Sequence, residues 1–129
     1  MKIAIDTNAY VDFCKGIPDA VTLLRQAEQI FVPYVVLGEL RGGFLCGTKG
    51  LQNERLLARF LNSPRVTLLF PDEETTHYYA RIFQQLKKQG TPIPSNDLWL
   101  AALVWQHHLH LFSKESHFRH LLQLVIVNP

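Results

Sequence analysis

Short apolar runs alternate with longer amphipathic stretches along this chain, and the two patterns predict different elements. Five mainly apolar runs of four to six residues are bounded by charged or turn-forming residues. Such runs are typical of strands that are buried on both faces of a parallel sheet. The expected strands are "KIAID" (2–6), "IFVP" (30–33), "RVTLLF" (65–70), "LHLF" (109–112) and "LVIV" (124–127).

Helices are predicted between these strands, because apolar residues there recur at helical spacing and Pro or Gly marks the ends. The expected helices cover residues 7–13, 17–29, 34–47, 51–63, 72–90 and 95–105, with a turn and a short helix over 113–122. Thr7 or Asn8 is expected to cap the first helix, and Ser95 or Asn96 the sixth. In the sixth helix, the eight residues after Asp97 lack any charged or strongly polar group, which predicts a buried helix.

The alternation of strands and helices predicts the fold class. Strand–helix–strand units form right-handed crossovers, which give a parallel sheet covered by helices on both faces. We therefore expect a three-layer α/β/α architecture with a central parallel sheet of about five strands. With 129 residues, the chain is expected to form a single domain, residues 1–129. In such sheets, ligands bind outside the C-terminal ends of the strands.

Composition narrows the class of protein. Apolar residues make up 47% and charged residues 19%, as in a globular domain rather than a disordered chain. The formal net charge of +2 neither requires nor excludes a nucleic-acid partner. There is no apolar run of 18 residues and no signal peptide pattern, so a cytoplasmic location without membrane contact is expected. Cys14 and Cys46 match no metal-binding spacing and are expected to be buried free thiols.

Four acidic residues that are far apart in the sequence are expected to meet at one edge of the sheet. Asp6 ends the first strand, and Glu39 lies in the helix that follows the second strand. Asp97 begins a helix that runs antiparallel to the fourth strand, so the start of that helix lies at the same edge. Glu115 comes just after the fourth strand. The C-terminal edge of the sheet should therefore carry all four carboxylates.

Clustered carboxylates of this kind indicate a metal site. They repel one another, and holding them in a partly buried pocket is unfavourable unless a cation is bound. Oxygen ligands without cysteine and with few histidines favour Mg²⁺ or Mn²⁺ over Zn²⁺. Gly42 and Gly43 follow Glu39 at the distance of one helical turn and leave space beside its carboxylate. An ion at this edge would activate water and neutralise phosphate in phosphodiester hydrolysis.

At these acids the sequence resembles the PIN domain family, and more closely its VapC-type toxins from toxin–antitoxin pairs. The segments "AIDTNAYVD", "VVLGELRGG", "PIPSNDLWLAA" and "LFSKESHF" are similar, in order and spacing, to the four acidic motifs of that family. The resemblance covers essentially the whole chain. It implies a Mg²⁺- or Mn²⁺-dependent endoribonuclease that forms a homodimer, is inhibited by a cognate antitoxin, and cuts RNA such as tRNA, rRNA or mRNA with a metal-activated water.

The resemblance also implies roles for individual residues. Asp6, Glu39 and Asp97 match the three metal-binding acids of the family. The fourth motif departs from the usual pattern, because Glu115 stands where Asp or Asn is common and His117 where a second acid is often found. Glu115 is expected to be the fourth catalytic acid and metal ligand, and the choice between one ion and two stays open.

Polar residues next to these acids are expected to support them by orienting a carboxylate or a water molecule. These supporting residues are Thr7, Asn8, Asn96, Ser113 and His117. If RNA is the substrate, a subset of the surface Lys and Arg residues must contact its phosphates. The candidates are Arg41, Lys49, Arg55, Arg59, Lys87, Lys88 and Lys114.

Two other functions stay open at this point. One is a PIN-like domain that binds RNA or a partner protein without cutting, since the fourth motif is altered. The other is a phospho-receiver signalling domain, which is also a parallel α/β domain with an acidic pocket. A receiver requires paired acids after the first strand and an acceptor Asp after the third, whereas Asp6 is single and Asp72 lies at a helix start. The nuclease is therefore the favoured function.

Overall fold

All five expected strands form. The computed structural model describes residues 1–127, so the last two residues of the expected 1–129 domain lie outside the described part. The strands are β1 (Lys2–Ile5), β2 (Gln29–Pro33), β3 (Val66–Leu69), β4 (His110–Phe112) and β5 (Val125–Val127). They make one sheet in the order β3-β2-β1-β4-β5. Every neighbouring pair is parallel, as predicted.

The first strand lies at the centre of the sheet and determines where a site can form. β1 pairs with β2 on one side and with β4 on the other. Ile5, the last residue of β1, is opposite Phe112, the last residue of β4. The chain thus adds β2 and β3 in one direction and then crosses back to add β4 and β5. Such a reversal leaves a crevice at the C-terminal ends of the two central strands, where α/β sheets bind ligands.

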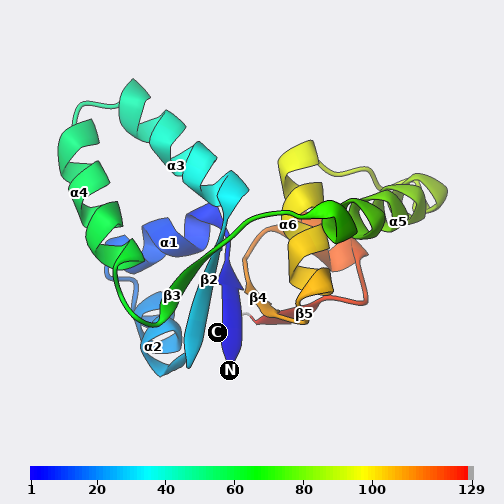
Figure 1. The fold of residues 1–129 in the computed structure, drawn as a ribbon, viewed down its shortest axis with the longest axis horizontal. Coiled ribbons are helices and arrows are strands. Elements are labelled where there is room, and N and C mark those ends of the chain that lie inside the picture. Colours follow the sequence, from blue (N-terminus) through cyan, green and yellow to red (C-terminus); the bar gives the residue numbers. More distant parts are fainter. Residues whose placement is uncertain (128–129) are drawn as a thin grey trace.

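Helices cover both faces of this sheet, which confirms the expected α/β/α architecture. The α-helices of residues 1–127 are α1 (Thr7–Cys14), α2 (Pro18–Gln26), α3 (Tyr34–Cys46), α4 (Gly50–Leu61), α5 (Glu73–Gln89) and α6 (Ser95–Gln106). A 3-10 helix, η1 (Ser116–His120), precedes β5. Figure 1 shows α1 to α4 on one side of the sheet and α5 and α6 on the other. None of the helices in the described part has the length and apolar character needed to cross a bilayer.

Helix α6 is buried on nearly every side, as its apolar run predicted. Its buried residues are Leu98, Leu100, Ala101, Ala102, Leu103 and Val104. Trp99 packs on Tyr79 of α5 with ring centroids 4.3 Å apart. Trp105 packs on Tyr78 of the same helix at 5.1 Å. Because α6 is held along its whole length, the position of its first turn, which carries Asp97, is fixed as well.

The predicted helix caps are wrong. α1 is capped by Asp6, whose carboxylate accepts a hydrogen bond from the backbone N–H of Ala9 at 2.8 Å. α6 begins after Pro94 and has no side-chain cap. Asp6 keeps the extended backbone of β1, and Pro94 has φ −57° and ψ 148°, so the polar residues that follow already lie in the first helical turn. The four expected caps are therefore helical residues: Thr7, Asn8, Ser95 and Asn96.

Both cysteines are free, as expected, but both are exposed rather than buried. Cys14 is the last residue of α1, and Cys46 is the last residue of α3. The expectation of burial followed the general preference of cysteine for protein interiors. Here the two side chains end helices that point outward from the sheet, so that preference does not apply.

Candidate active site

A cavity of about 490 Å³ lies where the C-terminal ends of β1 and β4 meet α3 and α6. The four expected acids, Asp6, Glu39, Asp97 and Glu115, all line it. Each comes from a different part of the fold: the end of β1, the middle of α3, the first turn of α6 and the segment after β4. The structure therefore brings together four carboxylates that the sequence separates by as many as 109 positions, from 6 to 115.

Asp6 is the most buried of these acids, with 8% of its surface exposed. One carboxylate oxygen accepts the hydrogen bond from Ala9 N–H, and the other accepts one from the Ser113 hydroxyl. Burial raises the pKa of Asp6, and the negative charges of Asp97 and Glu115 raise it further, while the two hydrogen bonds lower it. Asp6 is thus a carboxylate whose charged form gains from a nearby cation.

Glu39 faces the cavity from α3 and is exposed, whereas a partly buried acid was expected. The apolar residues around it in the sequence, such as Val36 and Leu40, are buried, whereas the Glu39 side chain itself is exposed. Its carboxylate accepts a hydrogen bond from the Thr7 hydroxyl at 2.8 Å. Atoms added at the Cβ positions of Gly42 and Gly43 would meet nothing within 4 Å, so the space predicted beside Glu39 is present.

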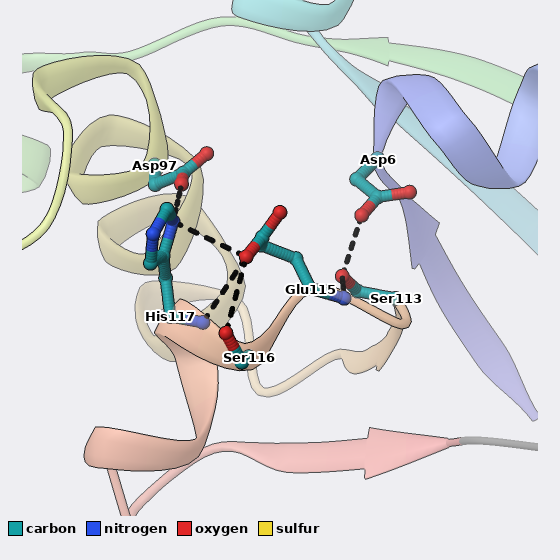
Figure 2. A network of polar contacts seen from close by, with 6 residues as sticks. All are labelled: Asp6, Asp97, Ser113, Glu115, Ser116 and His117. Carbon is teal, nitrogen blue, oxygen red and sulfur yellow. Dashed lines mark hydrogen bonds and ion pairs between the residues drawn. The ribbon is translucent and has the colours of Figure 1, made fainter.

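Asp97 and Glu115 are joined by His117 (Figure 2). The Nδ1 atom of His117 lies 2.7 Å from Asp97 Oδ2 and 3.4 Å from Glu115 Oε1. Glu115 is the N-cap of η1, and the same oxygen accepts from the backbone N–H of His117 at 3.5 Å and from the Ser116 hydroxyl at 3.4 Å. The short helix that follows β4 therefore fixes both carboxylates through one histidine.

Ser113 links this group to Asp6. Its side-chain oxygen accepts a hydrogen bond from the backbone N–H of Glu115 at 3.0 Å while its hydroxyl donates to Asp6. Figure 2 shows the resulting chain of contacts, which runs from Asp97 through His117, Glu115 and Ser113 to Asp6. Residues 113–117 thus connect the two walls of the cavity, with Ser113 bonded to Asp6 and His117 to Asp97.

The other expected supporting residues differ in what they contact. Thr7 binds Glu39, as described above. Asn8 and Asn96 line the cavity and are exposed, and neither side chain has a hydrogen-bond partner within residues 1–127. The structure therefore places both amides where they face solvent or a ligand, and it gives no support to a bracing role for Asn96.

Some cavity residues were missed by the sequence analysis. Pro94, Ser95 and Leu100 also line the cavity. Leu100 is three residues after Asp97, so helical spacing places it on the same face. Lys114, treated only as a surface cation, pairs with Asp12 of α1 at 3.4 Å and ties residues 113–117 to that helix. No local signal in the sequence indicates this pair, because it depends on the contact between β1 and β4.

The donor chemistry of the cavity fits a hard divalent cation. All of its charged lining side chains are carboxylates, the ligands that Mg²⁺ and Mn²⁺ prefer. Within residues 1–127, no three His, Cys, Asp or Glu side chains are arranged closely enough to hold a metal ion. Each acid is bonded instead to a protein donor. A bound ion would therefore have to draw the carboxylates inward against their mutual repulsion.

Known proteins share both the sequence pattern and the fold. Residues 3–122 match the model of the PIN domain. Ribonuclease VapC1 of Haemophilus influenzae strain R2866 is 32% identical over 107 residues, which cover 78% of this chain and 77% of the relative. The relative therefore matches this chain over most of its own length.

Similar solved structures include two VapBC structures. One is VapBC2 from Rickettsia felis bound to a DNA fragment from its promoter, with a TM-score of 0.85 and 26% identity over 99% of this chain and 98% of the other. Another is VapBC-1 from nontypeable Haemophilus influenzae, with a TM-score of 0.87 and 25% identity over the same shares. FitAcB from Neisseria gonorrhoeae follows at a TM-score of 0.78 and 25% identity, over 98% of this chain and 97% of the other. On the match of sequence and fold together, the chain belongs to the PIN domain family.

Proposed function

We propose that this chain is the endoribonuclease toxin of a VapBC-type toxin–antitoxin pair and that it hydrolyses RNA phosphodiester bonds. One observation carries the proposal: four carboxylates from four parts of a PIN fold line a single cavity at the C-terminal edge of the sheet. The ribonuclease names of its relatives and the toxin–antitoxin complexes among its structural neighbours support the same function.

In this proposal Asp6, Glu39, Asp97 and Glu115 hold a Mg²⁺ or Mn²⁺ ion. Such an ion, when bound, lowers the pKa of a water molecule and neutralises charge on the scissile phosphate. Ser113 and His117 keep the carboxylates of Asp6 and Asp97 oriented. Without a cation, the acidic cavity would repel an RNA phosphate, so the carboxylates make substrate binding depend on the ion.

RNA must also be held outside the cavity, and the described ion pairs narrow the candidates. Arg41 is bonded to Glu54, and Lys114 to Asp12, so both cations are already engaged. Other candidates are exposed on the α3–α4 side and have no ion-pair partner within residues 1–127: Lys49, Arg55 and Arg59. We propose that phosphates flanking the cut site contact this group.

A cognate antitoxin fits a second feature of the surface. Two shallow cavities meet at Phe44, and exposed leucines extend them along α3 and α4, with Leu45 89% and Leu51 69% exposed. Two residues next to the expected acids line one of these cavities: Tyr10, one helical turn after Asp6, and Leu40, the residue after Glu39. An antitoxin segment with apolar residues in this groove could therefore extend into the acidic cavity.

A homodimer would use a different face. Phe83 is 51% exposed and borders a mainly apolar cavity between α5 and α6, which Pro92, Ile93 and Leu98 also line. We propose that a second copy covers this face, because it leaves the acidic cavity and the α3–α4 groove open. Sedimentation of the purified chain with and without Phe83→Glu tests the dimer, which the added charge should dissociate.

The chemistry of cleavage tests the function itself. Hydrolysis by an activated water does not use the RNA 2′-hydroxyl, so the products should carry 5′-phosphate and 3′-hydroxyl ends. Activity should disappear in EDTA and return with Mn²⁺ or Mg²⁺. Ends with a 2′,3′-cyclic phosphate, or full activity in EDTA, would rule out this mechanism. Sequencing RNA ends after brief expression would also identify the RNA that is cut.

The alternatives predict other outcomes. A non-catalytic PIN-like domain would bind RNA equally well with and without the acids and would cut nothing. A receiver domain would be labelled by acetyl phosphate. Asp72, which would have to accept that phosphate, is instead the N-cap of α5, and its carboxylate accepts hydrogen bonds from Thr75 and Gln106. The bond from Gln106 and those from Thr75 lower the pKa of Asp72.

A further inference from the structure

His117 occupies a position between two carboxylates where a cation could otherwise bind. Its Nδ1 atom is 2.7 Å from Asp97 Oδ2 and 3.4 Å from Glu115 Oε1. An octahedral Mg²⁺ ion lies about 2.0–2.1 Å from each oxygen ligand. An ion bound to both oxygens on the side of the imidazole would therefore fall on or next to Nδ1, so the imidazole and an ion on that side exclude each other.

The proton on this nitrogen follows from the geometry. At 2.7 Å, a nitrogen lone pair and a carboxylate lone pair would repel, so a proton must lie between Nδ1 and Asp97. The 2.7 Å contact is therefore a hydrogen bond from the Nδ1–H group of His117 to Asp97 Oδ2. A nitrogen that carries a proton has no lone pair to offer a metal, so His117 cannot itself be a ligand through that atom.

The remaining oxygens of the two acids are free for one ion. In Figure 2 the second oxygens of Asp97 and Glu115 point away from the imidazole, toward the space that they share with Asp6. Two-ion nuclease sites hold their ions about 3.5–4 Å apart and bridge them with ligands common to both. His117 blocks the position on the far side of Asp97 and Glu115, so a second ion has no place there.

We propose that the N–H group of His117 takes the place of a second divalent ion, so that each chain binds a single ion among Asp6, Glu39, Asp97 and Glu115. This inference rests on the metal site proposed above. It makes His117 a positioning residue that also sets the number of ions. By hydrogen bonding, its N–H group supplies part of the positive charge that a second cation would place beside Asp97 and Glu115.

Metal stoichiometry tests this directly, without reference to cleavage. Titration of the metal-free full chain with Mn²⁺ by calorimetry should give one ion per chain, and the electron paramagnetic resonance spectrum should be that of an isolated ion. His117→Asp replaces the donor with a carboxylate, so it should bind a second Mn²⁺ and give the spectrum of a spin-coupled pair. His117→Asn keeps an N–H at the place of Nδ1 and should stay at one ion.

His120→Asp is the matched control, because it adds the same charge to η1 at an exposed position that does not line the cavity. It should bind one ion, like the parent. Two ions in the parent, or one in a folded His117→Asp, would overturn the inference and leave the metal site intact. The number of ions bound by the parent is measured without any variant, so it tests the inference even if His117→Asp does not fold. A parent that binds no Mn²⁺ would overturn the proposed metal site as well.

Discussion

The hydroxyl of Ser113 donates a hydrogen bond to the carboxylate of Asp6, although 107 residues separate the two in the sequence. Both side chains are buried, Asp6 with 8% and Ser113 with 2% of the surface exposed. They meet because β1 and β4 are neighbours in the sheet and end at the same level. Even with this bond, burial keeps the pKa of Asp6 raised, so its charged form is disfavoured when no cation is present.

Asp6→Asn should therefore make the metal-free protein more stable at neutral pH. A carboxyl whose pKa is raised in the folded state contributes stability below its unfolded pKa of 3.8, and this contribution is lost as pH rises through the folded value. The melting temperature of the parent in EDTA should fall relative to that of Asp6→Asn as pH rises from roughly 3.5 to 7. Asp19→Asn removes an exposed acid of α2 and is the control. A parent–variant difference that stays constant with pH would contradict the prediction.

Asp97→Asn should separate metal binding from helix stabilisation. As a mere first-turn acid, Asp97 would stabilise α6 by about 0.3–1 kcal/mol, and its loss would lower the melting temperature in EDTA. As one of several clustered acids, it should leave the metal-free protein as stable or slightly more stable when neutralised. With Mn²⁺ at roughly 100 times the dissociation constant, the parent should gain about 2.7 kcal/mol and the variant much less.

RNA cleavage by Asp97→Asn should nearly vanish. Melting curves of both proteins, in EDTA and in saturating Mn²⁺, give the comparison, and Glu73→Asn in the first turn of α5 controls for the loss of a helix-start charge away from the cavity. An Asp97→Asn protein that melts lower in EDTA, responds normally to Mn²⁺ and still cuts RNA would return Asp97 to a purely structural role.

The antitoxin should inhibit partly through a basic side chain in the acidic cavity. A guanidinium pairs with carboxylates in a bidentate manner, so an Arg of the bound antitoxin segment should reach Asp6, Glu39 or Asp97 and compete with the ion. Removing that Arg should weaken inhibition most at high Mn²⁺ concentration, as measured by RNA cleavage. Inhibition that survives truncation of every basic residue in the segment would exclude the idea.

His108→Gly should stabilise the fold. His108 follows the last turn of α6 with φ 53°, a left-handed conformation that glycine adopts without strain. Its backbone N–H and that of Leu109 bond to carbonyls of the last helical turn, so the conformation is required. The expected gain is about 1 kcal/mol in urea denaturation. His107→Gly, at φ −98°, should instead destabilise, since glycine there only adds freedom to the unfolded chain. Equal effects from both changes would argue against strain at His108.

The sequence was sufficient for the fold class because each strand and helix has its own local signal. It was also sufficient to place Asp6 and Asp97 at one edge, since parallel crossovers allow few topologies. It failed for the caps, because the helices begin directly after the extended backbone of Asp6 and Pro94, so each cap stands at least one residue before the predicted one. The bonds of Ser113 and His117 could not be derived at all, because they depend on side-chain orientations set by packing between distant segments.

The central position of β1 in the sheet also determines when the cavity can form during protein synthesis. Asp6 leaves the ribosome well before its neighbour β4 and the segment that carries Glu115. Chains fold during synthesis from the N-terminus onward, so β2 can pair with β1, and β3 with β2, early. The other edge of β1 stays unpaired until β4 has been made. The cavity is therefore incomplete on a nascent chain until β4 and the segment after it have emerged from the ribosome. A nuclease built in this order cannot cut the RNA of the machinery that makes it until all four acids have been synthesised.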